Sequence, residues 1–167
     1  MKTILAILLI STLCLNANQV EVGDKAPNFI LKTMDTGRSH SLKQFEGRVI
    51  VLKIWASWCR NCRREMPSFY RLQKKYNERK FRVLAISINE HQKPAQIFLK
   101  QLNKKMSMKT PFMVFHDPKR SVLKRYGAGG IPSTYLIDKK GIVQFAKTGN
   151  LDEDDMEELK SKIDALI

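Results

Sequence analysis

An apolar run that ends in two closely spaced cysteines constrains the fold of this chain more than any other feature. The run R-V-I-V-L-K-I-W, from Arg48 to Trp55, is rich in β-branched residues, as expected of a strand buried on both faces. Cys59 and Cys62 follow at once, and apolar side chains then recur at helical spacing to about Tyr76. The sequence therefore predicts a strand that leads into a helix, with both cysteines in the first helical turn.

The rest of the chain alternates strands with helices after an irregular lead over residues 20–36. Apolar and β-branched runs predict further strands over residues 81–88, from about 111, and over 133–138 and 142–147, where the last two form a hairpin. Helical spacing predicts helices over residues 94–102, 120–126 and from 151 onward. Strands joined through a helix should run parallel. Since no repeat or linker interrupts this order, we expect one α/β domain over residues 18–167.

The N-terminus has the pattern of a secretory signal peptide. Lys2 precedes an apolar run from Ile4 to Leu15, which is short for a membrane span and of the usual length for a signal-peptide core. We expect residues 1–17 to direct export to the periplasm. An uncleaved membrane anchor and lipidation at Cys14 stay open as alternatives.

The chain is strongly basic, with 30 lysines and arginines against 16 acidic residues and a net charge of +14. The cations are scattered through every segment, without the interleaved aromatic residues or the motifs that nucleic-acid-binding proteins carry. Nucleic acid is therefore not an expected partner. An anionic membrane surface or an acidic protein fits the charge, and so does a basic, solvated surface without a specific partner.

Three kinds of chemistry suit a Cys-x-x-Cys pair: a redox couple, half of a zinc site, or a structural disulfide. Zinc needs two more ligands, and the histidines His40, His91 and His116 are isolated in the sequence. A structural disulfide across so short a loop gains little chain entropy. The pattern therefore favours redox chemistry between Cys59 and Cys62, with no metal and no cofactor.

The position of Cys59 indicates how such a couple works. At a helix N-terminus, unpaired backbone N–H groups and the helix dipole stabilise an anion, and Arg60, Arg63 and Arg64 add positive charge. We expect these groups to lower the pKa of the Cys59 thiol, so that its thiolate attacks a substrate disulfide. Cys62, one turn deeper, then resolves the mixed disulfide.

Several separated motifs carry a family resemblance. The strand ending in W-A-S-W-C, the Cys-x-x-Cys pair that opens a helix, Pro67 and the later G-G-I-P-S-T before a hairpin resemble a thioredoxin-fold protein. The lead V-G-D-K-A-P-N-F, the string C-x-x-C-x-x-E-M-P and the extra segment over residues 89–110 are similar to the exported group of TlpA and ResA type. The resemblance implies a thioredoxin fold, with a central mixed β-sheet flanked by helices, an N-terminal extension and a central βα insertion.

The same resemblance implies a function and the residues that perform it. Proteins of this group are thiol:disulfide oxidoreductases that exchange disulfides with protein substrates and receive electrons from a membrane thiol donor, and many keep apocytochrome c cysteines reduced. The resemblance implies that Glu65 assists thiol proton transfer and that Pro132 is cis, opposite the cysteines. It further implies that Ile131 presents its backbone to substrate and that Trp58 forms an apolar lip, with a core tryptophan as the alternative.

Two residues depart from the resembling proteins. Lys53 stands where thioredoxins hold a buried aspartate, and we expect its ammonium to extend to water. Glu65, which has no cation at helical spacing, could substitute as the proton carrier. Asn61 stands where most of the group has proline, and the residues between the cysteines tune the redox potential. The arginines favour an oxidant and the resemblance favours a reductant, so the sequence leaves the direction of electron flow open.

Two other functions have partial support in the sequence. The lead and the insertion also resemble peroxiredoxins, but Ala56 occupies the place of the threonine that precedes their reactive cysteine, so peroxidase activity is not expected. Met106 and Met108 could join the thiols as soft ligands for Cu(I), although methionines in such a segment more often fill a small core. The alternatives to a disulfide reductant are thus an oxidising, disulfide-forming protein and a Cu(I)-handling thioredoxin-like protein.

Overall fold

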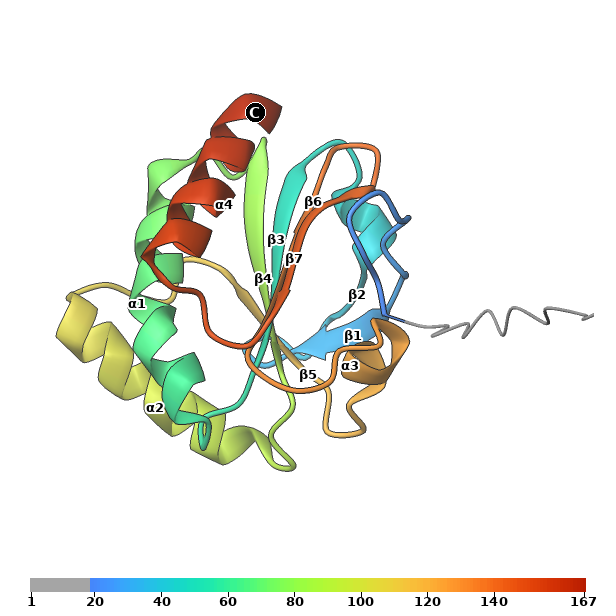
Figure 1. The fold of residues 1–167 in the computed structure, drawn as a ribbon. Coiled ribbons are helices and arrows are strands. Elements are labelled where there is room, and N and C mark those ends of the chain that lie inside the picture. Colours follow the sequence, from blue (N-terminus) through green and yellow to red (C-terminus); the bar gives the residue numbers. More distant parts are fainter. Residues whose placement is uncertain (1–18) are drawn as a thin grey trace, which may run out of the picture.

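The computed structural model describes residues 19–167, which form an α/β thioredoxin fold (Figure 1). The predicted signal peptide over residues 1–17, the anchor alternative and Cys14 lie outside the described residues. Within residues 19–167, no helix is both long enough and apolar enough to cross a membrane.

A mixed sheet of seven strands crosses the middle of the molecule, in the order β2-β1-β5-β4-β3-β6-β7. Its strands are β1 Ile30–Thr33, β2 Ser39–Ser41, β3 Val49–Trp55, β4 Phe81–Ser87, β5 Met113–His116, β6 Ser133–Ile137 and β7 Val143–Thr148. β3, β4 and β5 run parallel to one another, while β6 and β7 form the predicted antiparallel hairpin. Every residue of β3 is buried, Lys53 included, which confirms the expectation of a strand covered on both faces.

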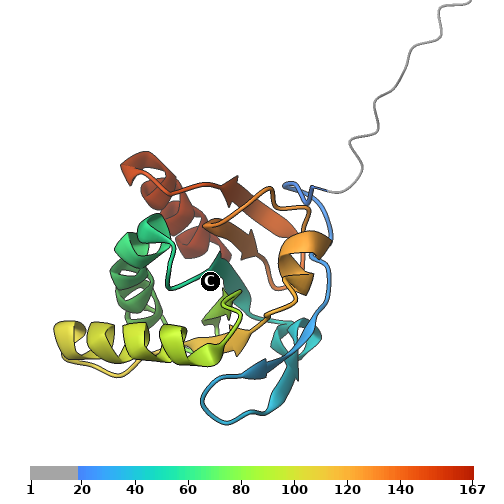
Figure 2. The same cartoon turned by 90° about the horizontal axis from the view of Figure 1, so that it is seen from below.

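Helices cover both faces of this sheet. They are the 3-10 helix η1 Leu42–Phe45 and the α-helices α1 Arg60–Lys75, α2 Gln92–Met106, α3 Ser121–Arg125 and α4 Glu153–Leu166. α1, α2 and α4 lie on one side of the sheet and α3 lies on the other, as the two views show (Figure 1; Figure 2). The loop from β3 to α1, which carries Cys59, lies at the end of the sheet where the parallel strands terminate, and Cys62 follows in the first turn of α1.

The lead is not irregular throughout, which corrects the expectation for residues 20–36. Residues 30–33 form β1, which pairs with β2 and, through Lys32↔His116 and Thr33↔Phe115, with β5. Ile30 is 70% exposed, so β1 has no unbroken apolar run. A short strand that is held mainly by backbone pairing leaves little trace in the hydrophobic pattern of a sequence.

α2 also extends beyond residues 94–102 at both ends. It includes Pro94 within its first turn, where the N–H group that proline lacks has no helical partner in any case. It ends at Met106, and the next residue, Ser107, has a φ of 51°, in the left-handed region that stops a helix.

Candidate active site

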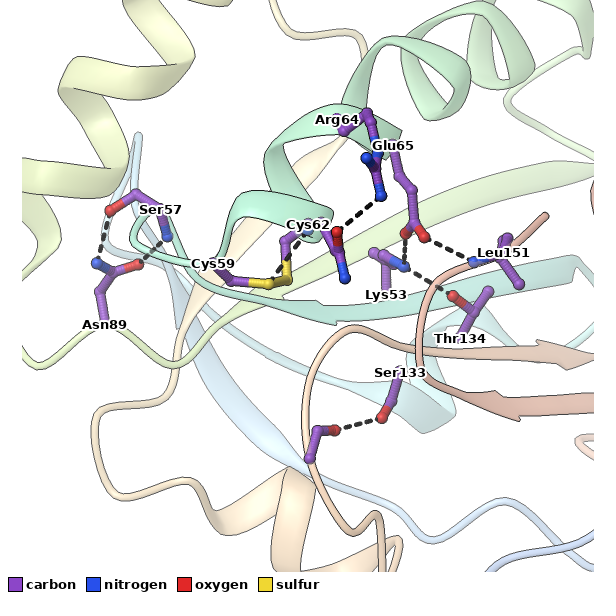
Figure 3. Close-up of a disulfide and its surroundings, with 12 residues drawn as sticks. Lys53, Ser57, Cys59, Cys62, Arg64, Glu65, Asn89, Ser133, Thr134 and Leu151 are labelled. Atoms are coloured by element: carbon purple, nitrogen blue, oxygen red, sulfur yellow. Dashed lines mark hydrogen bonds and ion pairs between the residues drawn. A yellow bond between two sulfur atoms is a disulfide. The ribbon is translucent and has the colours of Figure 1, made fainter.

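Cys59 and Cys62 lie at the start of α1, as predicted, and form a disulfide (Figure 3). Cys59 is the N-cap residue, and its Sγ accepts a hydrogen bond of 3.1 Å from the backbone N–H of Cys62. Cys59 is 9% exposed, whereas Cys62 is completely buried. Of the two cysteines, Cys59 is therefore the more accessible.

Positive charge surrounds this helix terminus. Arg60, Arg63 and Arg64 are exposed, and the first turn of α1 contains no acidic residue. Arg64 donates from Nη2 to Oδ1 of Asn61 at 2.7 Å. No ion pair among residues 19–167 neutralises the three arginines. Their charge is available to stabilise an anion at the helix terminus.

Lys53 does not reach water, so the expectation for this residue is wrong. Its side chain is completely buried, and its Nζ lies 2.5 Å from Oε2 of Glu65 and 2.9 Å from Oγ1 of Thr134. Because β3 is covered on both faces, the ammonium pairs with a carboxylate from α1 instead of reaching solvent. Burial lowers the pKa of the Lys53 ammonium, and the charge of Glu65 opposes that shift.

Glu65 thus has a cationic partner on a strand, although it has none on its own helix. Its other carboxylate oxygen, Oε1, accepts a hydrogen bond of 2.7 Å from the backbone N–H of Leu151, in the loop before α4. No direct hydrogen bond joins Glu65 to Cys62 among the described residues. Lys53, Glu65 and Leu151 therefore tie β3, α1 and the loop before α4 together behind the cysteines (Figure 3).

The peptide bond between Ile131 and Pro132 is cis, as the resemblance implied. β6 begins at the next residue, Ser133, which pairs with Ile54 near the end of β3. Because β3 leads directly to Cys59, this register places the Ile131–Pro132 segment at the cysteine end of the sheet.

Trp58, the residue before Cys59, is 63% exposed, so the alternative of a core tryptophan is wrong. Trp55, at the end of β3, is the completely buried tryptophan. Trp58 therefore presents an apolar surface to solvent beside the reactive cysteine.

Asn89 supports the site, and the sequence analysis did not identify it. Its Oδ1 accepts hydrogen bonds from the backbone N–H of Ser57 and from Oγ of Ser87, both at 3.0 Å, and its Nδ2 donates to Oγ of Ser57 at 2.8 Å. These bonds hold the loop that carries Trp58 and Cys59 against the end of β4. The available signal was its position after a predicted strand, because parallel neighbouring strands end at the same edge of a sheet.

The structure gives little support to the metal-binding and peroxidase alternatives. Within residues 19–167, no three His, Cys, Asp or Glu side chains gather in a group that could hold a metal ion. Met106 and Met108 are half-buried against the hydrophobic core, as expected of methionines that fill a small core, and Cu(I) handling stays an untested prediction. Ala56 is completely buried and provides no hydroxyl group beside Cys59.

Comparisons with known proteins agree with this geometry. The model of the AhpC/TSA family matches residues 22–146. The thiol-disulfide oxidoreductase ResA of Geobacillus thermodenitrificans is 31% identical over 166 residues, which cover 95% of this chain and 91% of that protein. The thioredoxin-like protein YneN of Bacillus subtilis is 30% identical over 139 residues, which cover 83% of this chain and 78% of that protein.

A solved structure extends the likeness to three dimensions. The crystal structure from Chlorobium tepidum, provisionally named thiol:disulfide interchange protein DsbE, superposes with a TM-score of 0.78 and 34% sequence identity. The match covers 89% of this chain and 99% of the chain from Chlorobium tepidum. The matched family model, the similar proteins and the cysteine pair at the start of α1 lead to one conclusion. The chain belongs to the AhpC/TSA family and is a thioredoxin-like thiol-disulfide oxidoreductase.

Proposed function

We propose that this oxidoreductase works outside the cytoplasm as a reductant of protein disulfides, with the cysteine pair of apocytochrome c as its substrate. The observation that carries the proposal is the disulfide at the start of α1, in which Cys59 is 9% exposed and Cys62 is completely buried. Haem attachment to c-type cytochromes uses both thiols of a Cys-x-x-Cys-His motif. The signal-like N-terminus supports export, and the resemblance to the ResA group supports this substrate.

The reaction starts from the reduced protein. The Cys59 thiolate attacks one sulfur of the substrate disulfide, so a mixed disulfide forms while the substrate S–S bond breaks, and the other substrate sulfur leaves as a thiolate that takes up a proton. The Cys62 thiol then loses its proton, and its sulfur attacks Cys59 and releases the second substrate thiolate. The substrate gains two electrons, and a membrane thiol donor later returns two electrons to the Cys59–Cys62 disulfide.

The substrate chain lies between Trp58 and the Ile131–Pro132 segment in this proposal. Ile131 is half-buried, and its backbone pairs with an extended substrate chain, as an added strand pairs with a sheet edge. Trp58 covers an apolar substrate side chain with its exposed indole. A chain held by both elements presents its sulfur to Cys59.

Glu65 accepts the proton of Cys62 in the second step. Cys62 is completely buried, so bulk water does not take its proton directly. Glu65 lies one helical turn further along α1, on the same buried side. Lys53 and the backbone N–H of Leu151 hold its two carboxylate oxygens in place. Lys53 is thus a positioning residue that acts through Glu65.

A peptide experiment tests the direction of electron flow. The reduced protein is mixed with an equal amount of a disulfide-bonded Cys-x-x-Cys-His peptide, and the thiols of both are quantified by alkylation and mass spectrometry. We expect the peptide to become reduced while the Cys59–Cys62 disulfide forms, because the proposed role is that of a reductant. The double variant Cys59→Ser/Cys62→Ser is the matched control and should leave the peptide oxidised. The opposite equilibrium, in which the oxidised protein converts the reduced peptide to its disulfide, would contradict the proposal.

A further inference from the structure

The surfaces of α1 and α2 carry charge of one sign. Every exposed charged side chain on these two helices is a lysine or an arginine, and their one acidic residue, Glu65, is buried. Acidic residues gather instead on α4, whose first turn contains Glu153, Asp154 and Asp155 and which lies beside α1 (Figure 1). The exposed charge of α1 and α2 is therefore positive, whereas the first turn of the neighbouring α4 is acidic.

A groove of about 440 Å³ lies between α1 and α2. Arg60, Arg63 and Arg64 line this α1–α2 groove from one side, and Lys105 lines it from the other. None of the ion pairs among the described residues includes any of these four cations. Positive charges gathered around one groove repel one another, and an anionic ligand relieves that repulsion.

Apolar side chains also line the α1–α2 groove. They come from Pro67 on α1 and from Phe98 and Leu102 on α2, and the guanidinium of Arg63 lies 5.2 Å from the ring centroid of Phe98. The groove begins at Arg60, the residue that follows Cys59. One end of the groove therefore lies near the N-terminus of α1, where Cys59 is the N-cap residue.

We propose that the α1–α2 groove binds an acidic segment of the protein substrate, next to the cysteine that Cys59 attacks. This inference rests on the proposed disulfide exchange and adds a substrate preference to it. Carboxylates of the substrate meet the guanidinium groups, whose planar shape suits paired hydrogen bonds to a carboxylate. Apolar substrate side chains cover Phe98 and Leu102.

A peptide segment fits this groove better than an anionic membrane does. A flat anionic surface that meets α1 also meets the acidic residues of α4 beside it, which it repels. A single chain enters the groove without this conflict.

Three synthetic peptides test the preference directly. They share one disulfide-bonded cysteine pair and differ only in flanking residues, which are glutamate, glutamine or lysine, and the measured quantity is the second-order rate constant of their reduction. At low salt we expect the glutamate peptide to react about tenfold faster than the glutamine peptide, and the lysine peptide to react more slowly than both. At about 1 M salt the three rate constants should converge, because charges are then screened over about 3 Å.

Charge-reversal variants separate the groove from the overall charge of the protein. Lys105→Glu and Arg63→Glu should each lower the ratio of the glutamate rate to the glutamine rate several-fold, and the ratio cancels any change in the reactivity of Cys59. Lys124→Glu, on α3 at the other side of the sheet, changes the net charge equally and should leave the ratio unchanged.

The outcomes distinguish this inference from the proposed function. Equal rate constants for the three peptides at low salt, or equal effects of Lys105→Glu and Lys124→Glu, would overturn the groove as a substrate site while disulfide exchange stands. A second outcome would assign the groove to a membrane surface and not to a peptide. In that outcome the protein binds anionic lipid vesicles, Lys105→Glu abolishes the binding, and the three peptides react at equal rates. Failure to reduce even the glutamine peptide would instead count against the proposed function.

Discussion

Replacing Cys62 with serine is expected to convert the enzyme into a covalent trap for its substrates. Cys59 keeps its place at the N-terminus of α1 and still attacks a substrate disulfide, but no second thiol remains to release the product. Turnover should fall to the uncatalysed background, while one substrate molecule becomes attached to each protein molecule. The mass of the adduct under non-reducing conditions measures this result, and a reducing agent should reverse it.

The matched control is Cys59→Ser, which retains the other cysteine. Cys62 is completely buried, so it should give neither turnover nor an adduct with a folded protein substrate. An adduct that forms equally in both variants would contradict the assignment of Cys59 as the nucleophile. The absence of any adduct in Cys62→Ser would contradict the exchange reaction itself.

Replacing Lys53 with methionine is expected to destabilise the oxidised protein by about 3–5 kcal/mol. The ammonium of Lys53 is the cationic partner of Glu65, and both side chains are buried. Methionine has a similar length and fills the space, but it leaves the buried carboxyl group of Glu65 without its cationic partner. Urea unfolding measures the loss as a lower midpoint at an unchanged slope.

The double variant Lys53→Met/Glu65→Gln tests the cause of that loss. It removes both charges and keeps an amide oxygen that accepts the N–H of Leu151, so it should recover most of the lost stability. A single variant Lys53→Met that unfolds within about 0.5 kcal/mol of the natural protein would show that the pair is not desolvated, because changes of this size are typical of surface sites.

The parts of the fold that the sequence predicted are those with strong local patterns. β3 is apolar and β-branched except for Lys53, α1 has helical spacing, and the turn between β6 and β7 contains Gly141, whose φ of 80° suits a tight turn. The position of Cys59 and Cys62 follows from the junction of β3 and α1. A resemblance, not a local pattern, supplied the cis bond before Pro132.

The parts that the sequence did not predict depend on contacts between distant segments. The partner of Lys53 is Glu65 on the next helix, and no spacing rule within one element could reveal this pair. Asn89 connects the ends of two parallel strands through its side chain. β1 is recognised by its pairing with β5 rather than by its own composition. In each case the missing information was a contact between segments that are distant in the sequence.

The most direct test of this account is a titration of the thiols in the reduced protein. The rate of alkylation of each cysteine is followed against pH, with Cys62→Ser and Cys59→Ser to assign the two curves. We expect the Cys59 thiol to ionise with a pKa at least about one unit below the value of about 8.5 for free cysteine, because the helix N-terminus and the neighbouring arginines stabilise its thiolate. Two thiols that both ionise at about 8.5 or above would contradict the claim that this site holds a thiolate ready for attack at neutral pH.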